Sequence, residues 1–136
     1  MPYFVATSSR LSILPNREYD NVLDVGCGLG AFARRLTPHA RQILGIDISD
    51  EAITEARRMS RELTNVRYVQ ADIYDFQAQG RVFDLIVLAD VLYYLAPLND
   101  RMLKLLGEKI ARLLSPGGCS LTAISSTLIE HRETDP

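Results

Sequence analysis

Residues 22–30 read VLDVGCGLG, a mainly apolar run that ends in three glycines at alternate positions. The run before Gly26 is typical of a buried strand, and the glycines are typical of a tight turn. Alternate glycines let the backbone bend sharply and come close to a ligand that side chains would keep away. The stretch therefore predicts a strand followed by a ligand-binding turn.

Apolar runs and helix-like segments alternate along the rest of the chain. The expected strands are residues 22–25, 42–46, 66–69, 83–88 and 120–125, and the expected helices are residues 31–36, 52–59 and 102–114. Ser49 and Asp50 are candidate N-caps for the second of these helices, and residues 3–14 are expected to form a helix or an arm across the sheet. This alternation indicates βαβ units and a parallel α/β sheet, whose ligands bind beyond the carboxyl ends of the strands.

Composition excludes several classes of protein. With 136 residues, 47% of them hydrophobic, the chain suits one domain rather than two. A net charge of −2 argues against a broad nucleic-acid surface, and no apolar run is long enough to span a membrane. No signal peptide is evident, and Cys27 and Cys119 form neither a disulfide framework nor a metal motif, so a cytoplasmic protein is expected.

An acid follows the second expected strand. Asp47 lies 19 positions after Gly28, where a carboxylate commonly accepts hydrogen bonds from ribose hydroxyls. Gly26, Gly28 and Ala31 also fit the dinucleotide pattern G-x-G-x-x-A. Both a nicotinamide cofactor and another adenosine-containing ligand would use Asp47, so this residue alone does not decide between them.

Asp24 separates the two interpretations. It lies two positions before the first glycine, where a pyrophosphate would meet its negative charge at short range. A ligand that carries an ammonium and a sulfonium would instead be attracted. S-adenosylmethionine is such a ligand, and its amino-acid end has no phosphate to bind. A nicotinamide oxidoreductase is therefore a remote alternative.

At these residues the chain resembles the class I S-adenosylmethionine-dependent methyltransferases. The resemblance rests on five segments in the family's order, which span about residues 20 to 125: LDVGCGLG (23–30), GIDIS (45–49), ADIYDF (71–76), FDLIVLADVLYYL (83–95) and LLSPGG (113–118). It implies a Rossmann-like three-layer sandwich with about five mainly parallel strands in the order 3-2-1-4-5. It also implies S-adenosylmethionine as cofactor.

The resemblance assigns roles to individual residues. The residues expected around the methionine moiety are Asp24, Gly26, Cys27, Gly28 and Gly30. Asp47 would hold the ribose hydroxyls, and the adenine would contact Ile48, Asp72 and Ile73. Ala89 and Asp90 would line the cavity near the sulfonium.

Residues 84–95 are also similar to the nodulation-type N-methyltransferases, which methylate an amino sugar; the paired Tyr93 and Tyr94 are the main likeness. The expected substrate is thus a small molecule, such as an amine or amino sugar. Asp90 is a candidate for orienting an amine, and either tyrosine could hydrogen-bond it or face its charge.

Each assignment has a simpler alternative. Asp47 could be a strand-end cap, Asp24 could accept from loop amides, and Asp72 could cap a turn over residues 73–76. Asp90 could be a solvated loop acid, and one of the adjacent tyrosines is expected in the core. Cys27 is expected to pack rather than to act as a nucleophile.

The length suggests a second class of function. We expect a single domain over residues 1–136, with an N-terminal arm or helix (1–20), a core (21–125) and a tail (126–136). Members of the family usually continue with a helix and a strand hairpin, for which the tail is too short. A partial or non-catalytic cofactor-binding domain is therefore an alternative. The fifth strand would be an exposed edge, through which two copies could pair.

Overall fold

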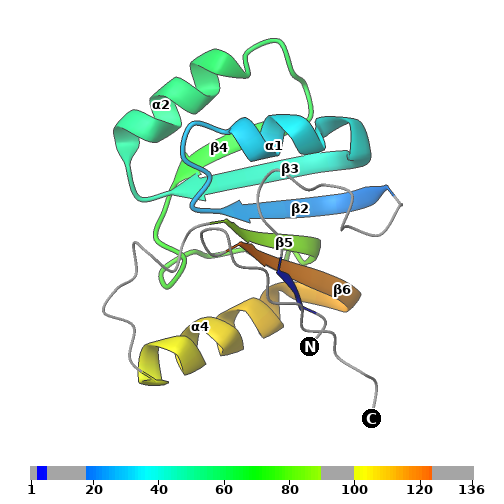
Figure 1. Ribbon diagram of the computed structural model, residues 1–136, viewed down its shortest axis with the longest axis vertical. Helices are drawn as coiled ribbons and strands as arrows, with labels where there is room; N and C mark the ends of the chain where they lie inside the picture. Colours follow the sequence, from blue (N-terminus) through cyan, green and yellow to red (C-terminus); the bar gives the residue numbers. More distant parts are fainter. Residues whose placement is uncertain (1–2, 6–17, 90–99, 124–136) are drawn as a thin grey trace.

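The sheet is the centre of the computed structural model, which describes residues 3–5, 18–89 and 100–123 (Figure 1). Its strands are β1 (Tyr3–Val5), β2 (Tyr19–Val25), β3 (Ala40–Asp47), β4 (Val66–Gln70), β5 (Phe83–Ala89) and β6 (Leu114–Ala123). They form one six-stranded sheet in the order β1-β6-β5-β2-β3-β4, and every neighbouring pair is parallel. The last five strands in sequence thus lie in the expected order 3-2-1-4-5.

The sixth strand, β1, corrects one expectation. Tyr3, Phe4 and Val5 pair in parallel with Ser120, Leu121 and Thr122 of β6. β6 is therefore not the edge strand at these residues, because the chain's own N-terminal strand lies beside it. The pairing of two copies through the sheet edge stays a prediction.

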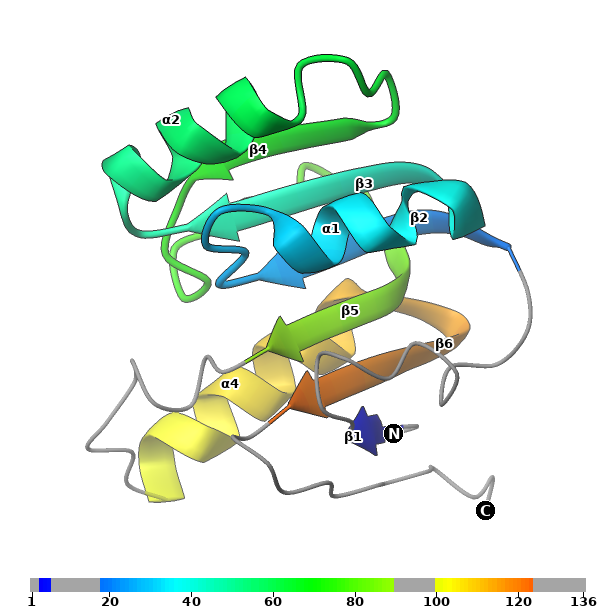
Figure 2. The ribbon, with the colours of Figure 1, turned by 45° about the horizontal axis from the view of Figure 1, so that its top comes forward.

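Helices lie on both faces of the sheet. The helices are α1 (Ala31–Leu36), α2 (Asp50–Met59) and α4 (Asp100–Leu113), with a short 3-10 turn, η2 (Thr37–His39), after α1. Figure 2 shows α1 and α2 on one face and α4 on the other. The expected three layers are confirmed.

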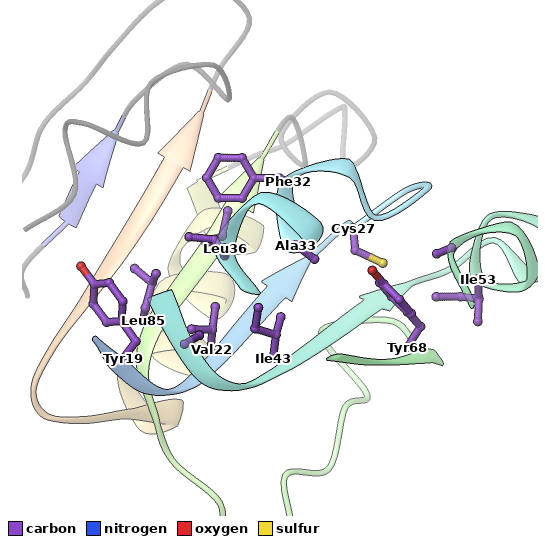
Figure 3. Packing of buried hydrophobic residues seen from close by; sticks show 13 residues of the cluster. Tyr19, Val22, Cys27, Phe32, Ala33, Leu36, Ile43, Ile53, Tyr68 and Leu85 are labelled. Atoms are coloured by element: carbon purple, nitrogen blue, oxygen red, sulfur yellow. The ribbon is translucent and has the colours of Figure 1, made fainter. Parts of the chain in front are cut away.

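Each face has its own apolar core. One cluster joins sheet residues such as Val22, Ile43 and Leu85 to Phe32 of α1 and Ile53 of α2 (Figure 3). The other joins Leu23, Ile46 and Ile86 to Leu106 and Ile110 of α4. Successive residues of a strand point to opposite faces, so a strand buried on both faces reads as a continuous apolar run. This explains why the central strands could be recognised in the sequence.

Local signals place the helix ends. Ser49 is the N-cap of α2, and its hydroxyl accepts a hydrogen bond from the amide of Ala52 at 3.2 Å. Such a cap satisfies one of the first-turn amides that have no partner within the helix. α1 ends at Leu36, and Pro38 lies in the following 3-10 turn, as expected for a residue that cannot donate to a preceding carbonyl.

Three strands begin earlier than expected. β3 begins at Ala40 rather than at residue 42. β2 begins at Tyr19, which pairs with Ala40 of β3. The carboxylate of Asp84 in β5 also accepts hydrogen bonds from the amides of Asp20 at 2.8 Å and Asn21 at 2.9 Å. β6 begins at Leu114, and its pairing shifts register between Phe83 and Leu85 of β5. Leu114, expected as the last residue of the helix over 102–114, begins this strand, and residues 115–118 lie within its irregular part.

Among the described residues, no helix is long and apolar enough to cross a membrane.

Leu85 provides a test of the core. It is fully buried in β5 and belongs to the cluster under α1. We expect Leu85→Ala to lower the free energy of unfolding by about 2 to 5 kcal/mol, because the lost burial is accompanied by a cavity. Val82→Ala, at a side chain that is 45% exposed, should change it by less than about 0.5 kcal/mol. Urea unfolding measures both, and equal effects would contradict the packing described.

Candidate functional site

The predicted site residues gather at one edge of the sheet. The glycine loop follows β2, Asp47 ends β3, Asp72 follows β4, and Ala89 ends β5. β2 lies between β3 and β5, so the chain leaves β2 in one direction for β3 and β4 and later returns to its other side. Ligands of such sheets bind at this reversal of strand order, beyond the carboxyl ends. The fold brings the sequence-predicted loops to that place.

The glycine loop makes a tight turn over the end of β3. The amides of Gly26 and Cys27 both donate to the carbonyl of Ile46, at 2.8 and 3.0 Å. Gly26, Gly28 and Gly30 have φ angles of 71°, 55° and 84°, in the left-handed region that other residues rarely adopt. The alternate glycines are thus required by the backbone, as the sequence predicts.

Two of these glycines differ in their surroundings. A Cβ at Gly28 would meet no atom within 4 Å, so this part of the loop faces open space. A Cβ at Gly30 would lie 2.9 Å from Nη1 of Arg34 and 2.9 Å from Cζ of Tyr68. The loop therefore has an open side at Gly28, accessible to a ligand, and a packed side at Gly30.

Asp47 connects the loop to the end of β3. Its Oδ2 accepts from the amide of Gly28 at 2.9 Å, and its Oδ1 accepts from the amide of Ser49 at 2.9 Å. The strand-end role considered from the sequence is therefore present. A carboxylate offers about four acceptor positions, so these two bonds leave capacity for ribose hydroxyls. The contacts also fix the carboxylate beside the open part of the loop.

Asp24 is an unpaired acid in the core of the site. It is 1% exposed, and within residues 3–5, 18–89 and 100–123 neither of its carboxylate oxygens has a hydrogen-bond partner. Burial, and secondarily the charge of Asp47, raises the pKa of Asp24 to about 7. The alternative that Asp24 accepts from loop amides is wrong. A buried, unpaired acid is costly, and an adjacent cation would offset that cost.

Cys27 packs into the core, as expected. Its side chain is 8% exposed and belongs to the cluster with Tyr68 and Ile53. Burial, followed by the charges of Asp24 and Asp47, raises the pKa of the thiol far above its usual range. A thiol in this state is a poor nucleophile. Its contact with a cofactor stays a prediction.

The residues expected around the adenine fall into two groups. Ile48 is 64% exposed at the end of β3 and is free to pack against a flat ring. Asp72 is exposed, and its Oδ1 accepts from the amide of Tyr74 at 3.0 Å, so it does form the turn considered as the alternative. Ile73 is 4% exposed and packs in the core with Phe76. Its place in the structure is that of a core residue, and its adenine contact stays a prediction.

The expected catalytic residues follow β5 in the sequence. Ala89 ends β5 and pairs with Ala123 of β6, which places it at the same edge as the glycine loop. Asp90, Tyr93 and Tyr94 lie outside the described residues. Their roles stay predictions.

A second set of residues around the loop was not anticipated from the sequence. Tyr68 of β4, Ser60 at the end of α2 and Arg34 of α1 form hydrogen bonds on the packed side of the loop. One signal could have indicated the space for Tyr68. Gly45 in the middle of β3 is unusual for a strand, and a Cβ there would lie 2.7 Å from Cδ1 of Tyr68.

No group of three His, Cys, Asp or Glu side chains that could hold a metal ion occurs within residues 3–5, 18–89 and 100–123.

Comparisons with known proteins agree with this geometry. The methyltransferase domain family matches residues 22–118, which is most of the chain and includes the glycine loop, Asp47 and Asp72. The chain belongs to the class I S-adenosylmethionine-dependent methyltransferase family. The resemblance inferred from the five sequence segments is confirmed, and so is the fold that it implied.

This methyltransferase domain is similar to nodulation proteins. Nodulation protein S of Rhizobium tropici is 38% identical over 98 residues, which cover 72% of this chain and 40% of that protein. The crystal structure of the N-methyltransferase NodS from Bradyrhizobium japonicum, in complex with S-adenosyl-L-homocysteine, is 33% identical with a TM-score of 0.71. That likeness covers 82% of this chain and 55% of NodS.

A more distant N-methyltransferase has the same fold. The phosphoethanolamine N-methyltransferase 1 of Haemonchus contortus, in complex with phosphoethanolamine and S-adenosylhomocysteine, is 27% identical with a TM-score of 0.74. The match covers 84% of this methyltransferase domain and 25% of that chain. The chain thus spans less than two thirds of the length of these relatives.

Proposed function

We propose that this methyltransferase domain binds S-adenosylmethionine at the carboxyl ends of β2, β3 and β4 and transfers its methyl group to a small-molecule amine. The observation that carries the proposal is Asp24, a buried carboxyl group with no hydrogen-bond partner in the described part of the chain, next to a glycine loop with an open side. The loop and Asp47 suit the amino-acid and ribose parts of the cofactor.

The charges at the site favour this cofactor over a dinucleotide. Asp24 is the residue that distinguishes them, because its carboxylate, when ionised, raises the cost of bringing a pyrophosphate to the glycine loop. An ammonium near Asp24 would have the opposite effect, because it stabilises the ionised carboxylate that burial disfavours. The residues present fit S-adenosylmethionine, and they oppose a nicotinamide cofactor.

The sulfonium of this cofactor carries a methyl group already activated for transfer. The domain therefore has to align the acceptor and exclude water, rather than generate a strong nucleophile. Asp47 and the glycine loop would fix the position of the cofactor at the edge of the sheet. Asp90 is proposed to orient the amine or accept its proton, and Tyr93 or Tyr94 to hydrogen-bond it.

The amine acceptor is supported by two relatives, a NodS N-methyltransferase and a phosphoethanolamine N-methyltransferase. The nodulation-type resemblance of residues 84–95 favours an amino sugar over other amines.

Calorimetric titration tests the cofactor. We expect the domain to bind S-adenosylmethionine and S-adenosylhomocysteine with saturable heat, and to give no heat with NAD at the same concentration. A folded chain that shows no binding at millimolar S-adenosylmethionine would contradict the proposal. Binding of NAD in its place would support the oxidoreductase.

Turnover is a separate test. Incubation with methyl-labelled S-adenosylmethionine and a panel of glucosamine oligosaccharides and simple amines should give label in an amine product. Asp90→Asn should lower either the rate or the acceptor affinity. Cofactor binding without label in any acceptor would favour the non-catalytic domain considered from the sequence.

A further inference from the structure

Tyr68 occupies the space beneath the glycine loop. Its ring comes so close to the backbone that a Cβ at Gly30 would lie 2.9 Å from its Cζ, and one at Gly45 2.7 Å from its Cδ1. Real side chains essentially never make such contacts, so both glycines leave room for the same ring. Figure 3 shows the hydroxyl end of Tyr68 directed toward Cys27 of the loop.

Polar contacts join this ring to the loop. The Tyr68 hydroxyl and the Ser60 hydroxyl lie 2.8 Å apart and share a hydrogen bond. Nη1 of Arg34 donates to the Ser60 hydroxyl at 3.2 Å and to the carbonyl of Leu29 at 2.6 Å. A continuous chain of hydrogen bonds therefore runs from β4 through α2 and α1 to the loop residue between Gly28 and Gly30.

The base of this chain is itself held in place. Ser60 is 5% exposed and ends α2, where its amide donates to the carbonyls of Ala56 and Arg57. Arg57 donates from Nε and Nη2 to the carbonyl of Tyr68, at 3.2 and 2.8 Å. The buried hydroxyls thus sit on fixed backbone. A buried hydroxyl that loses its hydrogen-bond partner destabilises the fold.

We propose that Tyr68, Ser60 and Arg34 form a bracket that sets the conformation of the glycine loop and so positions it for the amino-acid end of the cofactor. These three are positioning residues, because they act on the loop from its packed side. The proposal rests on the proposed function for the cofactor, whereas the bracket's hold on the loop can be tested without any ligand.

Packing alone would not require the hydroxyl. A phenylalanine would fill the same space between Gly30 and Gly45, and the apolar cluster around it would be unchanged. Tyr68→Phe therefore removes only the link to Ser60. Burial raises the pKa of Tyr68, so the phenol stays neutral in ordinary buffers and pH does not complicate the comparison.

Thiol labelling tests the hold on the loop. Cys27 lies in the loop and is 8% exposed, so a thiol reagent can reach it only when the loop opens. In a Cys119→Ser background, Tyr68→Phe should speed the labelling of Cys27 about fivefold, as expected for the loss of one hydrogen bond. Arg34→Gln should act similarly, and Arg58→Gln, whose side chain pairs with Glu55 on the surface, should not.

Leu85→Ala separates the bracket from general stability. This core substitution should lower the free energy of unfolding more than Tyr68→Phe does, yet it leaves the loop contacts in place. We expect it to change Cys27 labelling under native conditions by less than about twofold. If it speeds labelling as much as Tyr68→Phe, the thiol reports global unfolding and the bracket proposal fails.

Two ligands test the cofactor role. S-adenosylhomocysteine has the amino-acid end and methylthioadenosine lacks it, while both contain adenosine. Tyr68→Phe and Arg34→Gln should weaken the first about fivefold and leave the second unchanged. Equal losses for both ligands, or no loss, would overturn the positioning role. If the unchanged chain binds neither ligand, the proposed function fails, and the labelling experiment still decides whether the bracket holds the loop.

Discussion

Asp47→Ala should abolish cofactor binding at micromolar concentration. The substitution removes two acceptors at once, for the amide of Gly28 and for the amide of Ser49, each at 2.9 Å. It also removes the proposed acceptor for the ribose hydroxyls. Hydrogen bonds to a charged group contribute about 1.5 to 3 kcal/mol each, so we expect the Kd for S-adenosylmethionine to rise at least 100-fold. Calorimetric titration measures the change.

The ribose role and the loop role of Asp47 can be separated. If the carboxylate holds the hydroxyls, Asp47→Ala should weaken adenosine strongly and 2′,3′-dideoxyadenosine much less. If it only anchors Gly28, both ligands should lose affinity equally, and the ribose assignment would be wrong. Asp75→Ala, at an exposed carboxylate on the turn after β4, is the matched control and should bind as the unchanged chain does.

Much of the fold could be predicted because its signals are local. The central strands are buried on both faces and read as apolar runs, such as residues 83–88. The glycine loop could be predicted because left-handed backbone at three alternate positions requires glycine. Ser49 could be predicted as a cap from its place before α2. In each case the residue type is set by the local structure that the same residue forms.

The missed features depend on contacts between distant residues. Strand β1 has only three residues, too few to show periodicity, and its partner in β6 lies more than one hundred positions away. The earlier start of β2 depends on its pairing with β3, where Tyr19 lies opposite Ala40. The bracket joins residues from three elements. None of these features has a sequence pattern of its own.

The site residues also divide into those with local sequence signals and those whose contacts only the fold shows. Asp24 was predicted to lie at the cofactor because of its position before Gly26, but the sequence could not show whether it had partners. In the fold both of its oxygens are buried and have no hydrogen-bond partner among the residues that the structure describes. Asp72 was given two roles, and the turn role depends on an amide two residues away. A role that depends on a neighbour in the sequence, such as the turn at Asp72, can therefore be predicted from the sequence. Whether Asp24 has a hydrogen-bond partner depends on the fold and cannot.

Asp24→Asn should remove a pH dependence from both stability and cofactor affinity. Burial and the charge of Asp47 raise the pKa of Asp24 from 3.8 to about 7. Between these values the folded chain binds the proton more tightly than the unfolded chain. The carboxyl group therefore lowers stability as the pH rises from about 4 to about 7, by on the order of 4 kcal/mol in total. The asparagine variant lacks this decline, and urea unfolding at several pH values measures it.

Cofactor affinity should show the opposite pH dependence through the same residue, rising where stability falls. An ammonium placed beside Asp24 favours the ionised carboxylate, so binding below about pH 7 should release a proton. The affinity for S-adenosylmethionine should then rise with pH, approaching about tenfold per unit between pH 5 and 7. Titration in two buffers of different ionisation enthalpy measures the proton released. In Asp24→Asn the affinity should be flat over this range and no proton should be released. A slope that persists in this variant would mean that another group carries the linkage and that Asp24 does not meet the cofactor's charge.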